Sequence, residues 1–251
     1  MRERVYRTEA IVLRRSDFGE ADRLVVLATP GGKRRVIAKG VRKTTSRLAG
    51  HIELFTHATM LLAVGRNLDI ITQSQAIRSL SALRAELPRL SAAYYVAELY
   101  DRFTEQEEEN SALFQLLAQT YTALDRSANP DLVLRSFELR LLQIAGYRPH
   151  LHHCVVCQET LTESADRFSP SLGGVLCPND RGADRRALVM SGPAFRLLRY
   201  LQTQPVEAAE VLRLSPEVRG EAEQLLRAYL RQILERDLKS VAFLEDVARG
   251  A

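Results

Sequence analysis

The spacing of hydrophobic residues changes near residue 80, and this change constrains the fold of the chain more than any other feature. Before it, short runs of β-branched and apolar residues alternate with turn residues, which is typical of β-strands. After it, apolar residues recur every three or four positions, which indicates amphipathic helices. The 251 residues therefore predict an α+β protein, with a β-domain in residues 1–80 and an all-helical domain after it.

Five strands are expected in the first 80 residues. Pro30-Gly31-Gly32 is a turn signal between two of them and indicates a hairpin. Five short strands over about 75 residues favour a small five-stranded barrel of the OB-like or SH3-like type. The expected strands cover residues 8–14, 23–29, 33–39, 52–64 and 68–77.

The helical domain is expected in two parts, residues 81–149 and 187–251, with an insertion of residues 150–186 between them. Helix patterns cover residues 88–100, 111–124, 130–145 and 216–233, and a further one begins after Ser191. Asn129 and Ser215 each precede a proline and an acidic residue, so they are expected to cap the helices that follow. The helix over 216–233 is expected to pack on the earlier ones.

All three cysteines of the chain fall in the insertion. Cys154, Cys157 and Cys177 follow the pattern C-x2-C-x19-C, and Asp180 stands where a fourth cysteine would complete it. A zinc ribbon typically has two pairs of ligands, each pair on a tight turn. A segment of β-strands of about this length connects the two turns. We therefore expect a structural Zn2+ in a zinc-ribbon-like module.

The fourth ligand of this zinc site stays open. The carboxylate of Asp180 is a permitted ligand, although carboxylates are rarer than cysteines in structural sites. His150, His152 and His153 lie just before the first cysteine pair and are the alternative. A third hypothesis is a ribbon that keeps its fold without the metal.

A catalytic zinc is the less favoured interpretation. Glu159 after Cys157, followed later by Cys177-x-x-Asp180, resembles a deaminase pattern only faintly, because its proline and its last cysteine are missing. The chain also has no P-loop, no GxSxG and no HExxH motif. We therefore expect a binding protein and not an enzyme.

Positive charge is concentrated in the β-domain. Residues 1–80 hold 15 Lys and Arg against 7 Asp and Glu, a net charge of +8, whereas the rest of the chain carries −4. Seven cations without an acidic residue among them follow one another closely: Lys33, Arg34, Arg35, Lys39, Arg42, Lys43 and Arg47. Arg14 and Arg15 on the first strand are further candidates. Such an excess of charge is the footprint of a protein that binds a polyanion.

Aromatic residues are sparse beside these cations. The first 80 residues hold only Tyr6, Phe18 and Phe55. OB folds that bind single strands usually offer aromatic side chains on which bases stack. Their scarcity predicts contacts to the phosphate backbone that tolerate any base sequence.

No segment predicts export or membrane insertion. The longest uncharged hydrophobic run, residues 54–65, is shorter than the roughly 20 residues that a membrane span needs. The N-terminal residues lack an apolar signal segment, and three cysteines do not make a disulfide framework. A place in the reducing cytoplasm, in association with the nucleoid, is expected.

The order of these motifs resembles that of the RecO family of bacterial DNA repair proteins. The resemblance rests on segments spread over the β-domain and on the helix end before the cysteines. The segments are TEAIVL at 8–13, GEADR at 19–23, TPGGK at 29–33, AKGVRK at 38–43 and GYRP at 146–149.

The resemblance implies an OB fold, a helical domain and a zinc finger that is complete or degenerate. It implies a protein that binds single- and double-stranded DNA, anneals strands and acts with RecR and RecF to help load RecA onto DNA coated by single-strand binding protein, SSB. The C-terminal tail of SSB is expected on the helical domain. The resemblance places DNA contact on the seven cations and zinc on the three cysteines, with Asp180 departing from the usual fourth cysteine.

Two other hypotheses stay open. In the first, the chain is a protein–protein adaptor whose helical domain recruits partners, and the barrel is not primarily a DNA site. In the second, it is a zinc-dependent nucleic-acid enzyme, which would show turnover that chelation abolishes. Affinity for DNA in the absence of partners distinguishes the adaptor from the DNA-binding protein.

Overall fold

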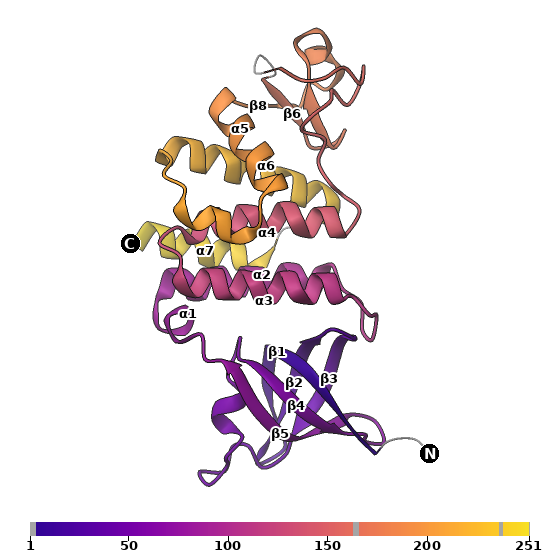
Figure 1. Ribbon diagram of the computed structural model, residues 1–251, viewed down its shortest axis with the longest axis vertical. Coiled ribbons are helices and arrows are strands. Elements are labelled where there is room, and N and C mark those ends of the chain that lie inside the picture. Colours follow the sequence, from indigo (N-terminus) through magenta and orange to yellow (C-terminus); the bar gives the residue numbers. More distant parts are fainter. Residues whose placement is uncertain (1–3, 163–165, 236–237, 251) are drawn as a thin grey trace.

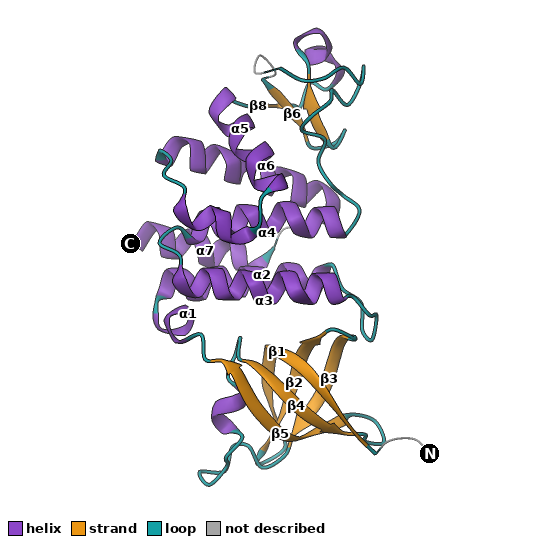
Figure 2. Ribbon diagram, in the orientation of Figure 1, coloured by secondary structure: helices purple, strands orange, loops and turns teal. Residues whose placement is uncertain are grey.

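The computed structural model describes residues 4–162, 166–235 and 238–250. Three parts follow one another along the long axis of the molecule (Figure 1). A β-barrel forms one end, helices form the middle, and a small module with three short strands forms the other end (Figure 2). The α+β class predicted from the sequence is confirmed.

The barrel is closed and has the strand order β1-β2-β3-β5-β4. Neighbouring strands are antiparallel except β3 and β5, which pair in parallel. β1 pairs with β4 through its first half and with β2 through its second, and a register shift between Val12 and Arg14 lets it bend. This arrangement is OB-like. The strands are β1 (Val5–Phe18), β2 (Asp22–Thr29), β3 (Gly32–Ala38), β4 (His57–Ala63) and β5 (Asp69–Arg78).

The prediction of a strand over residues 52–64 is wrong in its first part. Ala49–Ile52 is a short 3-10 helix, η1, and β4 begins only at His57. Phe55 explains the difference, because its φ of 65° does not fit a strand. Its ring is completely buried and stands edge-on to Tyr94, with 5.1 Å between the ring centroids. This part of the hydrophobic run therefore binds the barrel to the helices.

The helices lie in layers between the barrel and the module (Figure 1). α2 and α3 lie next to the barrel, α4 lies in the centre, and α5 and α6 lie toward the module. The expectation that the helix over 216–233 packs on earlier ones is confirmed, since α6 contacts α4. The helices are α1 (Ser81–Ala85), α2 (Leu87–Arg102), α3 (Ser111–Arg126), α4 (Pro130–Ile144), α5 (Gly192–Thr203), α6 (Pro216–Leu234) and α7 (Lys239–Gly250).

α4 and α6 begin at the expected prolines. Asn129 and Ser215 are the N-cap residues of these helices, as predicted, but their side chains form no capping hydrogen bond. Asn129 instead donates from Nδ2 to the carbonyls of Glu210 and Leu212, at 3.1 and 3.2 Å. It therefore holds the end of the 3-10 helix η3 (Val206–Val211) against the start of α4.

The segment between α2 and α3 closes over the hairpin of β2 and β3. The backbone N–H of Glu107 donates to the carbonyl of Lys33 at 3.1 Å, and that of Asn110 donates to the carbonyl of Pro30 at 3.2 Å. Gly32 has a φ of +94°, and a Cβ there would lie 2.5 Å from the carbonyl oxygen of Glu108. The close approach of the two segments therefore requires glycine.

The insertion forms a three-stranded sheet in the order β7-β6-β8. Phe168 of β6 is completely buried and stands edge-on to Tyr229 of α6, with 5.8 Å between the ring centroids. This contact fixes the module on the helical domain. The elements are β6 (Arg167–Ser169), β7 (Gly174–Leu176), β8 (Leu188–Val189) and the 3-10 helix η2 (Pro178–Ala183). Across the described residues, no helix combines the length and hydrophobicity that crossing a bilayer requires.

Candidate nucleic-acid interface and metal centre

The pairing of β1, β2 and β3 determines which side chains share the outside of the barrel. Side chains at paired positions lie on the same face of a sheet, and successive residues alternate between faces. Val25, Leu27, Val36 and Ala38 belong to the barrel core, so the residues between them point outward. From the helical domain toward the free end, the outward rows are Arg14–Val26–Arg35, Ser16–Leu24–Ile37 and Phe18–Asp22. We call this surface the outer face.

A basic loop, residues 39–47, continues from β3 at the free end of the barrel. The N–H of Gly40 donates to Asp22 Oδ1 at 2.7 Å, and the N–H of Arg42 donates to the carbonyl of Ala21 at 2.9 Å. The Arg42 guanidinium also lies 3.4 Å from the Asp17 carboxylate. These contacts hold the basic loop against the turn between β1 and β2, beside the outer face.

Four of the seven predicted cations are exposed and form no ion pair within the described residues. They are Arg35, Lys39, Lys43 and Arg47. A fifth, Arg42, is exposed but shares its charge with Asp17. Arg14 lies in the same row as Arg35 and its side chain is 65% exposed, but its guanidinium lies 3.2 Å from the Asp101 carboxylate and so shares its charge as well. Arg15 faces the other way and pairs with Glu53.

The helical domain engages the other two predicted cations. Lys33 is 9% exposed, and its Nζ donates to the carboxylate and to the carbonyl of Asp101, each at 2.8 Å. Arg34 lies over the ring of Tyr6, 5.6 Å from the centroid, with its guanidinium 3.9 Å from the Glu107 carboxylate. The structure thus places Lys33 and Arg34 at the junction of the domains and not with the exposed cations.

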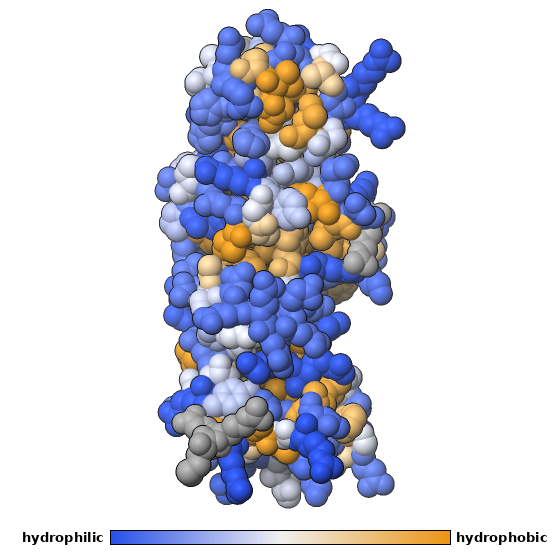
Figure 3. Space-filling model, turned by 90° about the vertical axis from the view of Figure 1, so that its right-hand side faces the viewer, coloured by the Kyte–Doolittle hydropathy of each residue, from blue (hydrophilic) through white to orange (hydrophobic). Residues whose placement is uncertain are grey.

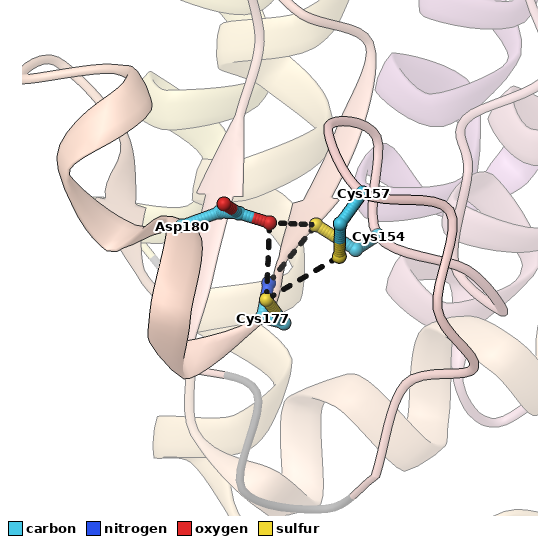
Figure 4. A group of neighbouring side chains, drawn as sticks. All are labelled: Cys154, Cys157, Cys177 and Asp180. Atoms are coloured by element: carbon cyan, nitrogen blue, oxygen red, sulfur yellow. Dashed lines mark hydrogen bonds between the residues drawn. The ribbon is translucent and has the colours of Figure 1, made fainter.

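The three cysteines and Asp180 come together in the module (Figure 4). All four ligand atoms lie within 4.8 Å of one another. Asp180 Oδ2 is 3.2 Å from the sulfur of Cys154 and 3.2 Å from that of Cys177, and the sulfurs of Cys157 and Cys177 are 3.7 Å apart. We call these residues the Cys3Asp cluster.

The geometry of the Cys3Asp cluster fits a zinc ion. A tetrahedral zinc with Zn–S bonds of about 2.3 Å separates its sulfur ligands by about 3.8 Å, close to the separation of Cys157 and Cys177. Cys154 comes from the turn before β6, and Cys177 with Asp180 from the turn that opens η2. The N–H of Cys177 donates to the sulfur of Cys154 at 3.4 Å, which stabilises a thiolate there. A metal would tie two otherwise separate turns together.

The protonation of the thiols fits a metal site as well. Burial raises the pKa of Cys154, but the N–H groups of Cys177, Cys157 and Val156 outweigh it and lower that pKa overall. The Glu159 N–H lowers the pKa of Cys157, but the Asp180 carboxylate, desolvation and the sulfurs of Cys154 and Cys177 together outweigh it and raise that pKa to about 12. A metal that binds here must therefore displace protons.

The three histidines lie outside the cluster. His152 Nδ1 is 3.0 Å from an Arg199 guanidinium nitrogen, and burial together with that cation lowers the pKa of His152. The backbone of His150 pairs with Gly173, and His153 forms a β-bridge with Thr160. Asp180, and none of these histidines, completes the group of four.

Known proteins resemble the chain over almost its full length. Residues 1–80 match the family "Recombination protein O N terminal", and residues 84–242 match "Recombination protein O C terminal". The DNA repair protein RecO of Roseiflexus sp. (strain RS-1) is 59% identical over 98% of this chain and 87% of its own length. Those of Dehalococcoides mccartyi (strain 195) and Symbiobacterium thermophilum are 37% and 36% identical, each over 98% of this chain and over 97% and 99% of their own lengths.

Proposed function

The chain belongs to the RecO family of DNA repair proteins, and from this premise we propose that it binds DNA with the outer face and the basic loop. One observation carries the proposal: Arg35 on the outer face and Lys39, Lys43 and Arg47 in the basic loop are exposed without acidic partners among the described residues. Cations of this kind bind phosphates and release the counterions that DNA had condensed. Such contacts position a strand without reading its sequence.

We propose that the protein is a recombination mediator and not an enzyme. A surface that screens phosphates can hold two strands at once, so annealing of complementary strands needs no chemistry from the protein. In the same proposal it binds single- and double-stranded DNA in the cytoplasm, at the nucleoid. It acts with RecR, and with RecF, to help load RecA onto DNA coated by SSB.

The three parts have separate roles in this proposal. Residues 1–80 bind DNA, and the helical residues 81–149 and 187–251 bind the C-terminal tail of SSB. Residues 150–186 hold a structural Zn2+ through Cys154, Cys157, Cys177 and Asp180. When bound, the metal supplies a cross-link between the turns of the module, which has little apolar core of its own.

A groove in the helical domain favours the adaptor as a second candidate function. It measures about 510 Å³ and lies among α2, α4, α6 and α7, where Leu134 and Leu244 line it together with Arg135 and Arg227. Figure 3 shows apolar side chains gathered over the helical middle and the module on one face of the molecule. Both arginines already pair with glutamates, Arg135 with Glu138 and Glu223 and Arg227 with Glu223 and Glu245, so the groove offers a partner peptide mainly its apolar side chains. A pulldown with SSB that survives nuclease treatment, from protein without DNA affinity, would favour the adaptor.

Charge reversal on the barrel tests the DNA-binding proposal. The triple variant Arg35→Glu, Lys39→Glu and Lys43→Glu leaves Arg42 unchanged, because Arg42 holds the basic loop against the turn between β1 and β2. We expect affinity for a labelled single-stranded oligonucleotide, measured by fluorescence anisotropy, to fall at least about tenfold. The slope of log affinity against log salt should decrease by about 2, since each lost phosphate contact removes about 0.7.

The control variant carries the same change of charge elsewhere. Arg126→Glu, Arg185→Glu and Arg213→Glu alter exposed residues of the helical domain and the module. Its affinity should stay within about twofold of the unchanged protein, because these residues belong neither to the outer face nor to the basic loop. Equal losses in both triple variants would show that net charge, and not the barrel surface, governs binding.

A further inference from the structure

We propose that Phe18 is the residue on which an unpaired DNA base stacks. The outer face would then bind a single strand through its bases as well as its phosphates. This inference rests on the proposed DNA-binding function and deepens it, because it names single-stranded DNA as the preferred ligand.

Phe18 lies at the free end of the outer face. It is the last residue of β1, it pairs with Asp22 across the turn, and its side chain is 47% exposed. The Asp22 carboxylate accepts the N–H of Gly40 at 2.7 Å. That hydrogen bond brings the start of the basic loop beside the Phe18 row.

The other two aromatic residues of the barrel cannot offer a ring to a base. Phe55 is completely buried between the barrel and the helices. The ring of Tyr6 carries the Arg34 guanidinium, and its hydroxyl donates to Asp69 Oδ2 at 2.6 Å. Within the described part of the barrel, Phe18 is therefore the aromatic ring open to solvent.

The surface between Phe18 and the cations suits a strand. Phe18 lies four positions after Arg14 on β1, about 13 Å away at about 3.3 Å per residue. Leu24 and Ile37 lie half-buried in the row between them and form an apolar floor. Arg35 lies on β3, the second strand from β1, and Lys39 follows the end of β3, where phosphates would pass. The face thus combines an exposed ring, apolar side chains and unpaired cations, the elements with which OB folds hold single strands.

Stacking on Phe18 selects for single strands. Bases in a duplex are paired and stacked on one another, so they offer no free face to the ring. Phosphates are present in both forms of DNA, so the cations alone would bind both. The sequence suggested contacts to the backbone alone, and the exposure of Phe18 adds the bases.

Oligothymidine and an abasic strand of the same length separate the two kinds of contact. The unchanged protein should bind oligothymidine more tightly than the abasic strand, because only oligothymidine has bases to stack. Phe18→Ala should weaken binding of oligothymidine by about 5- to 150-fold, the range for loss of one stacked base. Its affinity for the abasic strand and for duplex DNA should change less than twofold, and Phe18→Tyr should keep the affinity for oligothymidine.

A tryptophan reports on stacking directly, since the chain contains none. In Phe18→Trp, oligothymidine should quench the fluorescence and the abasic strand should not. Ile77→Trp is the matched control, because Ile77 is similarly exposed, at 46%, but lies on β5 near the helical domain. Its fluorescence should respond to neither strand.

The outcomes distinguish a failure of the proposed DNA binding from a failure of the stacking role of Phe18. If the unchanged protein binds no DNA even at low salt, both the proposed function and the stacking role fail. If it binds with a normal salt dependence but Phe18→Ala binds oligothymidine equally well, the stacking role alone fails. Quenching of Phe18→Trp by the abasic strand would also overturn stacking.

Discussion

Lys33 and Gly32 show how single residues at one turn join the barrel to the helices. Lys33 is buried against Asp101, and Gly32 lies under the backbone of Glu108. In the sequence, a lysine within a basic stretch is predicted to contact DNA. Its acidic partner, Asp101, lies 68 residues further along the chain, so no local pattern reveals the pair. Only the folded chain reveals that this cation stabilises the domain junction.

The close contact at Gly32 predicts that an added methyl group destabilises the protein. Gly32→Ala combines a positive φ of +94° with a clash against backbone atoms, and we expect a loss of about 2–4 kcal/mol in the free energy of unfolding. Gly19→Ala is the control, since Gly19 has a φ of +59° but no atom within 4 Å of the added Cβ. It should cost about 1–2 kcal/mol. Urea denaturation measures both, and equal losses would contradict the close contact.

The Cys3Asp cluster was largely visible in the sequence. The spacing of the three cysteines indicated which residues meet, because zinc-binding turns have a narrow range of lengths. The choice between Asp180 and the three histidines was not visible. It depends on the turn that opens η2, which brings the Asp180 carboxylate onto the sulfurs while Arg199 occupies His152.

At the scale of elements, two residues of α4 form a buried ion pair in the centre of the helical domain. Arg135 and Glu138 are 5% and 0% exposed, with 2.7 Å between guanidinium and carboxylate. The Tyr95 hydroxyl donates to the same carboxylate oxygen at 2.6 Å. Burial raises the pKa of Glu138, so its charge depends on Arg135.

Removal of one partner of this pair should destabilise the protein strongly. Arg135→Met leaves Glu138 buried without its cation, and we expect a loss of about 3–5 kcal/mol. The double variant Arg135→Met and Glu138→Leu should lose less than Arg135→Met alone, because no uncompensated charge remains. Chemical denaturation of both variants checks the order. A double variant at least as unstable as the single one would contradict this account.

α7 is docked by a carboxylate at its first turn. Glu98 of α2 accepts the N–H of Lys239 and the N–H and hydroxyl of Ser240, at 3.0, 2.8 and 2.7 Å. Burial raises the pKa of Glu98, but these hydrogen bonds outweigh it and hold the pKa below 4.5. Because its pKa is lowered, ionised Glu98 stabilises the docked state at every pH above the ordinary pKa of a glutamate. This stabilisation disappears as the pH falls through the lowered pKa of Glu98.

Acid should therefore loosen α7 before the rest of the helical domain. As the pH falls below about 4.5, residues 239–250 should exchange their amide hydrogens faster, relative to α4, than the intrinsic pH dependence explains. Glu98→Gln should show this faster exchange already at neutral pH. If the variant protects α7 as well as the unchanged protein does, Glu98 does not hold the helix.

Most elements could be predicted from periodicity, and the exceptions have a common cause. Four of the five strands and the long helices lie within a few residues of their predicted positions. The start of β4 and the role of Asn129 were missed, because Phe55 and Asn129 serve contacts between parts of the molecule. Local patterns report which face of an element is apolar, and not which distant element covers it.

At the scale of the whole molecule, the proposed DNA site and the Cys3Asp cluster lie at opposite ends (Figure 1). The module contacts the helical domain, as at Phe168 and Tyr229, while the basic loop contacts the turn between β1 and β2 and, through Val41, the barrel core. Loss of the proposed zinc ion should therefore disturb the module without altering the barrel.

Chelation tests this separation. Treatment with a strong zinc chelator should make residues 150–186 sensitive to proteolysis, because the cluster then loses its cross-link. The affinity for single-stranded DNA should change less than twofold in the same sample. A parallel loss of DNA affinity would show that the module contributes to the interface or to the stability of the barrel.

Hydrogen exchange with and without oligothymidine tests most directly whether the barrel end binds DNA. At saturating oligonucleotide and moderate salt, the account predicts slower exchange in residues 14–24 and 35–47. Exchange in residues 150–186 should not change. Slower exchange confined to the module or to the helices, with the barrel unaffected, would contradict the central claim.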